Sequence, residues 1–287
     1  MRLHRFIPSR LRLAALEWLS RVKQTAFGRN TEALLIQSKN GRLLVDVHDQ
    51  YVGRHLAYEG EYGRRELEQL RATLSVSDNL LIVGAHIGSI AIPISQCCRS
   101  VTAIEANPRS FQLLQLNICI NRRENVRAMH IAANDKAEEL QFVASTVNSG
   151  GSKRLPVVRD QAYFFDAPEL TSVPGARLDD MLQGMSFEVV LMDIEGSEYF
   201  ALCGMQNILS RAKVLFVEFV PHHLRNVSNV TVEQFLEPIR PHFSSLLVPS
   251  RKCAVPSDQW CQVLQTMYDR NESEDEIIFG KSCSFPS

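Results

Sequence analysis

The feature that most constrains this chain is an apolar run that ends in glycines and is followed by a second apolar run ending in a carboxylate. Residues 80–88 read LLIVGAHIG, and residues 101–108 read VTAIEANP. An apolar run without polar alternation is typical of a strand buried on both faces, and glycines permit a sharp turn and a close backbone approach to a ligand. The pattern therefore predicts a strand, a glycine turn, a helix and a second strand of a parallel α/β sheet.

The two turns of this unit form a candidate nucleotide-cofactor site. Ligands of doubly wound α/β folds bind beyond the carboxyl ends of the strands, where a carboxylate can accept hydrogen bonds from both hydroxyls of a ribose. The alternative is an ordinary turn between a strand and a helix. The residues expected to contact the cofactor here are Gly84, Ala85, His86, Gly88, Glu105 and Ala106.

Composition favours one large α/β domain with terminal additions. The chain has 287 residues and 45% hydrophobic content, which is enough for a sizeable core. The formal net charge of -1 gives no overall basic field, so we expect no nucleic-acid partner. The 7 cysteines form no CxxC pair, which predicts reduced thiols and a reducing compartment such as the cytoplasm.

Residues 1–30 are predicted to form a basic amphipathic helical segment ahead of a main domain at residues 31–287. The apolar residues at helical spacing are Leu11, Ala15, Trp18, Leu19 and Val22. Two interpretations stand: a helix docked on the domain with a solvated charged face, or a helix that contacts a partner protein or an anionic membrane surface, peripherally at its inner face. No transmembrane helix is evident, and Arg12 and Glu17 interrupt any signal-peptide core.

Strand and helix patterns alternate through the rest of the chain. A predicted strand at residues 126–132 is followed by Asn134 and Asp135, which either form a turn or contact an adenine base. Residues 142–176 read as a long irregular insert, which is either a substrate loop or lid or a flexible surface loop. Residues 178–182 read as a helix capped by an aspartate.

A second buried strand ends in carboxylates at residues 189–198, which read VVLMDIEGSE. Asp193 and Glu195 should emerge on the same edge of the sheet as the glycine turn, because both follow parallel strands. A helix cap explains one acid but not three around a glycine. A further strand at residues 214–219 leads into His222 and His223, either of which could act as a general base or lie idle on the surface.

Taken together, the motifs resemble the FkbM family of S-adenosylmethionine-dependent methyltransferases. The resemblance spans about residues 46–248, in the family's order. The motifs are DQYVG at 49–53 with EGEY at 59–62, the glycine turn, EANP at 105–108, RLDD at 177–180, DIEGSE at 193–198 and VE at 217–218.

The resemblance implies the class I methyltransferase fold. This is a Rossmann-like, seven-stranded, mostly parallel sheet with helices on both faces and an antiparallel C-terminal hairpin, here residues 243–248 and 276–279. It also implies S-adenosylmethionine as cofactor and methyl transfer to a hydroxyl, commonly of a sugar, glycan or secondary metabolite. The chain departs from the family at Ile82, His86 and Met192, where an acid, an asparagine and a lysine are usual.

The resulting hypothesis assigns a role to each residue. Glu105 is expected to bind the ribose, and Asp193, also a candidate cofactor contact, or Glu195 to orient the acceptor hydroxyl, with His86 or His222 as base. We expect no metal, because no convincing set of further ligands accompanies Asp193.

Two alternatives belong to other functional classes. One is a cofactor-binding partner or scaffold protein that has lost catalysis, which the departures at Ile82 and His86 favour. The other is an NAD(P)-dependent oxidoreductase, for which the G-x-G-x-x-G spacing is absent. The expected acceptor is a small molecule or a glycan, and the oligomeric state stays open.

Overall fold

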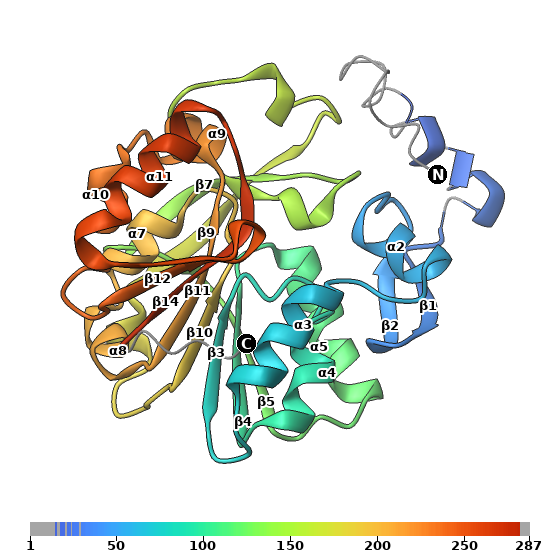
Figure 1. Cartoon of the computed structure of the whole chain (residues 1–287). Helices are drawn as coiled ribbons and strands as arrows, with labels where there is room; N and C mark the ends of the chain where they lie inside the picture. Colours follow the sequence, from blue (N-terminus) through green and yellow to red (C-terminus); the bar gives the residue numbers. More distant parts are fainter. Residues whose placement is uncertain (1–14, 16–17, 21, 24, 29, 282–287) are drawn as a thin grey trace.

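The computed structural model describes residues 15, 18–20, 22–23, 25–28 and 30–281, and an eight-stranded sheet forms their centre (Figure 1). Its strand order is β13-β12-β14-β11-β10-β3-β4-β5. The run from β5 to β11 is parallel, and β14 pairs antiparallel with both β11 and β12. The strands are β3 (Asn79–Val83), β4 (Ser100–Glu105), β5 (Val126–His130), β10 (Val189–Met192), β11 (Val214–Phe219), β12 (Ser245–Val248), β13 (Cys253–Pro256) and β14 (Glu274–Gly280).

This sheet confirms the predicted doubly wound α/β class and differs from the expectation by one strand. β12 and β14 are antiparallel neighbours, as expected for residues 243–248 and 276–279. β13 adds an eighth strand by pairing antiparallel with β12. β13 and a helix lie between β12 and β14 in the chain. The two strands of the expected hairpin are therefore adjacent in the sheet but are not joined by a tight turn.

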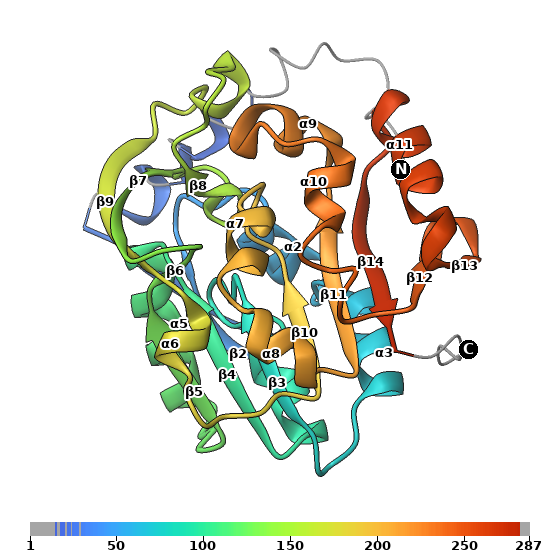
Figure 2. The same cartoon turned by 90° about the vertical axis from the view of Figure 1, so that its left-hand side faces the viewer.

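Helices cover both faces of the sheet, and the side chains of β3 are accordingly apolar on both faces. Leu80 and Ile82 pack into one core cluster, whereas Leu81 and Val83 pack into another. Figures 1 and 2 show the corresponding layers. The first cluster includes side chains from α3 (Arg64–Thr73), α4 (Ala91–Ile94) and α5 (Pro108–Ile120). The second includes α6 (Leu178–Met181), α7 (Glu198–Cys203), α8 (Gln206–Arg211), α10 (Val232–Leu236) and α11 (Trp260–Asp269).

The segment expected to be an irregular insert at residues 142–176 is irregular over most of its length, but its two ends and residues 153–154 belong to a second, four-stranded sheet of order β6-β9-β7-β8. Its strands are β6 (Ala132–Ala133), β7 (Glu138–Ala144), β8 (Lys153–Arg154) and β9 (Glu169–Ala176). Leu140, Phe142 and Val173 form its small buried core. Pairing of β7 with β9 across a long connection supplies this core, and sequence periodicity in one strand does not reveal such a distant partner.

A β-hairpin of β1 (Ala33–Ser38) and β2 (Gly41–Asp46) precedes α2 (Val52–Tyr58). The Asp49 carboxylate starts α2 by accepting hydrogen bonds from the backbone N–H groups of Tyr51 and Gly53, both at 2.8 Å. The helix expected after the glycine turn is short, because α4 ends at Ile94 and a 3₁₀ turn at Ser95–Cys97 follows it.

Asp179 also differs from its expected role. Its carboxylate accepts the backbone N–H groups of Asn207 and Ile208 and so caps α8 rather than its own helix. In the N-terminal segment, residues 15, 18–20, 22–23 and 25–27 are helical, and the rest of the expected helix up to residue 30 lies almost entirely outside the described residues. Among the described helices, none is long and apolar enough to cross a membrane.

Candidate active site

A deep open cavity lies beyond the carboxyl ends of β3, β4 and β10. It contains about 1190 Å³ of empty space, part of it open to solvent. The expected residues that line it are Gly84, Ala85, His86, Glu105, Ala106, Asp193 and Glu195. Tyr51, Tyr62, Glu66, Phe142, Ser149 and Arg154 from other elements also line it. The two carboxylate turns predicted from the sequence therefore do meet in one space.

Gly84 allows the two turns to approach each other. Its φ is 94°, and a Cβ atom at this position would lie 1.8 Å from the carbonyl oxygen of Asp193. No side chain fits in that space. Gly88 has a different task, since a Cβ there would meet Leu114 at 2.8 Å and Gly88 does not line the cavity. Gly88 is therefore a packing residue under α5 rather than a wall of the site.

Glu105 is held in place by the backbone around it. Its two carboxylate oxygens accept the N–H groups of His86 and Asn107, each at 2.7 Å, and only 7% of the residue is exposed. Burial raises the pKa of Glu105 to about 7, although these backbone hydrogen bonds oppose the shift. An oriented carboxylate at the tip of β4 is suited to accept ligand hydroxyls.

His86 joins Glu105 to the loop of the second sheet. Its Nε2 lies 2.7 Å from the Ser149 hydroxyl, which in turn donates to the Asp49 carboxylate. Because the only proton of that hydroxyl goes to Asp49, the hydroxyl accepts from His86, and the ring carries its proton on Nε2. Burial lowers the pKa of His86, against the opposing charges of Asp49 and Asp46, and keeps the ring neutral.

Asp193 extends into the cavity from the turn after β10. It is exposed there, and among the described residues its carboxylate has no hydrogen-bond partner. Desolvation in this enclosed space, followed by the charge of Glu218, raises the pKa of Asp193 well above its usual range. A free carboxylate with a raised pKa is a stronger proton acceptor than an ordinary aspartate.

The other two acids of the turn have separate roles. Glu198 accepts the backbone N–H groups of Ile194 and Gly196 and thereby holds the turn together. Glu195 has a left-handed backbone, with φ of 57°, and its carboxylate lies 2.9 Å from the ammonium group of Lys153. Although burial opposes it, Lys153 holds the pKa of Glu195 below its usual value.

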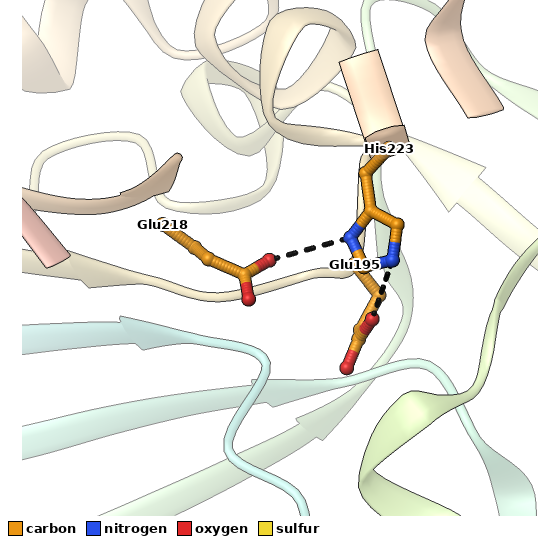
Figure 3. A group of neighbouring side chains, drawn as sticks. All are labelled: Glu195, Glu218 and His223. Carbon is orange, nitrogen blue, oxygen red and sulfur yellow. Dashed lines mark ion pairs between the residues drawn. The ribbon is translucent and has the colours of Figure 1, made fainter. Parts of the chain in front are cut away.

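Glu195, which lines the cavity, forms a partly buried group with Glu218 and His223 (Figure 3). The two carboxylates lie at opposite nitrogens of the ring, with Glu195 3.3 Å from Nε2 and Glu218 3.6 Å from Nδ1. Lys153 lies 3.4 Å from Nε2, so the ammonium group of Lys153 and the carboxylate of Glu195 both face this nitrogen. Burial and this ammonium group lower the pKa of His223.

These three residues have the chemistry of metal ligands, with ligand atoms within 4.8 Å of one another. However, the Lys153 ammonium group already supplies a positive charge to Glu195, where a metal ion would otherwise do so. The arrangement is better suited to acid–base chemistry than to metal binding.

Three other predicted site residues lie outside the cavity lining. The ring of His222 contacts the hydroxyl of Tyr163 and the carboxylate of Asp160. The side-chain amide of Asn134 donates within its own turn, to the Lys136 carbonyl and to Glu138, so its side chain serves the turn rather than the cavity. Asp135 offers its carbonyl to Arg177.

The sequence reasoning missed several residues that the fold brings to the site. Asp49 was noted only as part of the DQYVG motif, Ser149 and Lys153 lie in the segment expected to be an irregular insert, and His222 rather than His223 was chosen as a candidate base. His86, whose N–H binds Glu105, has a left-handed backbone with φ of 50°, as Glu195 does. A non-glycine residue with positive φ next to a glycine indicates a constrained turn. Only the structure reveals those backbone angles.

Comparison with known proteins gives a family match. A family model described as the methyltransferase FkbM domain matches residues 83–243, more than half of the chain. No curated protein matches the chain.

Among solved structures, a methyltransferase FkbM from Methylobacillus flagellatus KT is 19% identical with a TM-score of 0.41, covering 73% of this chain and 47% of that one. Trm5b from Pyrococcus abyssi is 14% identical with a TM-score of 0.40, covering 75% and 47%. TYW2 from M. jannaschii, in complex with AdoMet, is 12% identical with a TM-score of 0.47, covering 88% and 86%. The present chain thus spans less than half the length of the first two.

Proposed function

Because the chain belongs to the methyltransferase FkbM family, we propose that it transfers the methyl group of S-adenosylmethionine to a hydroxyl oxygen of a sugar, glycan or secondary metabolite. One observation carries this proposal: the fixed carboxylate of Glu105 and the free carboxylate of Asp193 line the same cavity, at the ends of the two strands that flank β3. One is suited to binding and the other to chemistry.

The residues at this site fit S-adenosylmethionine. Glu105 has the orientation needed to accept the ribose hydroxyls, and the turn at residues 84–86 offers close backbone approach for the methionine part. Beside Ala106, the buried side chains of Leu140 and Phe142 supply an apolar wall suited to a flat base. When bound, the cofactor supplies an electrophilic methyl group on a positively charged sulfur.

The residues of the chain then orient the acceptor and remove its proton. Asp193 accepts a hydrogen bond from the acceptor hydroxyl and takes its proton as the oxygen becomes methylated. Glu195, held by Lys153, fixes the turn that carries Asp193. Holding the reactants in line contributes on the order of 7–11 kcal/mol to lowering a barrier, so positioning accounts for most of the expected rate.

A hydroxylated acceptor suits the mouth of the cavity. Tyr51 and Tyr62 line it beside the carboxylates of Glu66 and Asp193. Aromatic faces pack against the apolar faces of sugar rings, and carboxylates accept hydrogen bonds from hydroxyl groups. The described cysteines that are free thiols, among them the buried Cys98, support a reducing compartment such as the cytoplasm.

The first test is calorimetric titration of S-adenosylmethionine and S-adenosylhomocysteine into the protein, its Glu105→Ala variant and a Glu124→Ala control. Glu124 is an exposed carboxylate outside the cavity. We expect binding in the protein and the control and at least about a tenfold loss in Glu105→Ala, since hydrogen bonds to a charged group contribute about 1.5–3 kcal/mol each. Binding followed by an acceptor screen tests turnover.

The same titration separates the alternatives. Binding without turnover across many hydroxylated acceptors would favour a cofactor-binding partner protein, to which the apolar Ile82 at the cavity wall gives some support. Failure of both ligands together with binding of NAD or NADP would favour an oxidoreductase. Failure of all four would contradict the proposed cofactor site.

A further inference from the structure

The described helical residues near the N-terminus turn their apolar side chains toward solvent. Ala15, Trp18, Leu19, Val22 and Ala26 follow the spacing of one helix stripe. Trp18 is 63% exposed, Val22 44% and Leu19 39%, and the nearby Phe27 is 53% exposed. Single exposed apolar residues are common on protein surfaces, but a continuous exposed stripe that includes a tryptophan indicates an interaction site.

The polar side of the same helix faces the protein instead. Ser20 is only 4% exposed and its hydroxyl lies 3.2 Å from Nδ1 of His48. The Lys23 ammonium group donates to the Asp49 carbonyl at 3.4 Å. Figure 1 shows the described pieces of this segment beside α2 and the β1–β2 hairpin. Among the described residues of the segment, polar side chains make the contacts with the domain and the apolar stripe is exposed, which a helix docked on the domain by its apolar face does not explain.

The charge of the segment indicates what covers the stripe. Its only acid is Glu17, while its basic residues are Arg2, Arg5, Arg10, Arg12, Arg21, Lys23 and Arg29. A second copy that paired through the same stripe would bring an equally basic segment against it, and the two segments would repel each other. An anionic lipid surface instead offers both an apolar layer for the stripe and negative headgroups for the basic residues.

We propose that this segment docks the protein on an anionic lipid surface, with Trp18, Leu19 and Val22 entering the boundary between headgroups and acyl chains. Tryptophan is favoured at that depth because its ring is apolar and its N–H group is polar. Contacts through Ser20 and Lys23 would then keep the domain next to the surface, with α2 and the Asp49 turn nearest to the segment.

Tryptophan fluorescence gives a direct test, because the chain has 2 tryptophans. Trp260 is 0% exposed and its indole N–H donates to the Val255 carbonyl, so aqueous iodide should quench Trp18 and spare Trp260. Vesicles containing phosphatidylglycerol should shift the emission to the blue and protect it from iodide. Phosphatidylcholine vesicles, or high salt, should lower the bound fraction by about tenfold, because the attraction of basic residues to headgroups is screened.

Flotation with the same vesicles tests the residues. Trp18→Ser combined with Val22→Ser should reduce the floated fraction by about tenfold or more, because apolar burial drives insertion. Val76→Ser is the matched control, since Val76 is 81% exposed at another place on the surface. It should float like the unaltered chain.

Failure of the unaltered protein to float with phosphatidylglycerol would overturn the proposal. So would equal flotation of the double variant and the control. Concentration-dependent dimerisation that the double variant abolishes, without flotation, would assign the stripe to a second copy instead. None of these outcomes depends on methyl transfer.

Discussion

The turn after β4 and the turn after β10 have the same form in sequence, an apolar run that ends in a carboxylate, and the structure gives them opposite properties. Both oxygens of Glu105 are occupied by backbone N–H groups in a nearly closed space. The Asp193 carboxylate is exposed to the cavity, and no described residue donates a hydrogen bond to it. A fixed acceptor binds a ligand with little loss of entropy, whereas a free one can take a proton.

The difference arises in what supports each turn. Glu105 is enclosed by the glycine turn through the N–H of His86. At the second turn Glu198 uses its own carboxylate to hold the backbone, which leaves Asp193 uncommitted. In the first turn, the carboxylate that binds the backbone N–H groups is therefore Glu105, the residue predicted to bind the ligand. In the second turn it is Glu198 rather than Asp193.

The largest expected effect distinguishes the two carboxylates directly. Asp193→Asn should lower kcat by about 10²–10⁴-fold, the usual contribution of a general base, because an amide cannot accept the proton. The affinity for S-adenosylhomocysteine should change by less than about threefold, since Asn has nearly the same shape as Asp and substitutions at exposed sites cost little.

The measurements are initial rates with a methylated product and calorimetry. Asp180→Asn serves as the control, because the Asp180 side chain is 65% exposed and pairs with Arg177 away from the cavity. If turnover survives Asp193→Asn, this carboxylate does not act in the mechanism. The proposed difference between a binding turn and a reactive turn would then be wrong.

The next effect concerns pH and Glu105. Its folded pKa of about 7 exceeds the usual 4.5, so below neutrality the protonated form can no longer accept from both ribose hydroxyls. Binding of S-adenosylhomocysteine should be strongest above about pH 7 and weaken on acidification, by up to about tenfold per pH unit. Titrations in a pH series check this, and Glu105→Gln should give a flatter profile. A flat profile in the unaltered protein would contradict the assignment.

The free energy of unfolding should change with pH in the direction opposite to ligand binding. Because the folded protein holds the Glu105 proton more tightly than the unfolded chain, the free energy of unfolding of the ligand-free protein should fall as pH rises from 4.5 to about 7. Glu276, whose pKa burial also raises to about 7, adds to the same trend. Urea unfolding across this range measures it, and saturating S-adenosylhomocysteine should oppose the loss.

A smaller effect separates the two adjacent histidines. His223→Gln should lower kcat by about tenfold, because His223 orders the Glu195–Lys153 pair beside the reactive turn. His222→Gln should change kcat by less than about twofold, as expected for a partly exposed ring outside the cavity. A kinetic pH profile altered in the first variant alone would support the assignment, and equal effects would remove the distinction.

Removal of metal ions is expected to have no effect on activity. Dialysis against a chelator should leave kcat unchanged, because Lys153 already neutralises Glu195 where a metal ion would bind. Loss of activity restored by a divalent cation would instead assign Glu195, Glu218 and His223 to a metal centre.

Much of the fold could be predicted because its signals are local. Apolar runs such as residues 80–83, glycine turns and Pro108 at the start of α5 each act within one element. The meeting of Glu105 with Asp193 at one edge of the sheet follows from them, because both residues come at the ends of parallel strands. The second sheet could not be predicted this way, since β7 and β9 stabilise each other only once a long connection has closed.

The sequence by itself determined the α/β class, the family motifs and the strand ends that carry the carboxylates, because backbone sterics and hydrophobic periodicity set them. Only the tertiary structure decided which carboxylate is bound by backbone and which is free, that Ser149 and Asp49 fix the proton on His86, and that His223 rather than His222 faces Glu195. These depend on distances between segments far apart in the chain. They arise only after packing has brought those segments together.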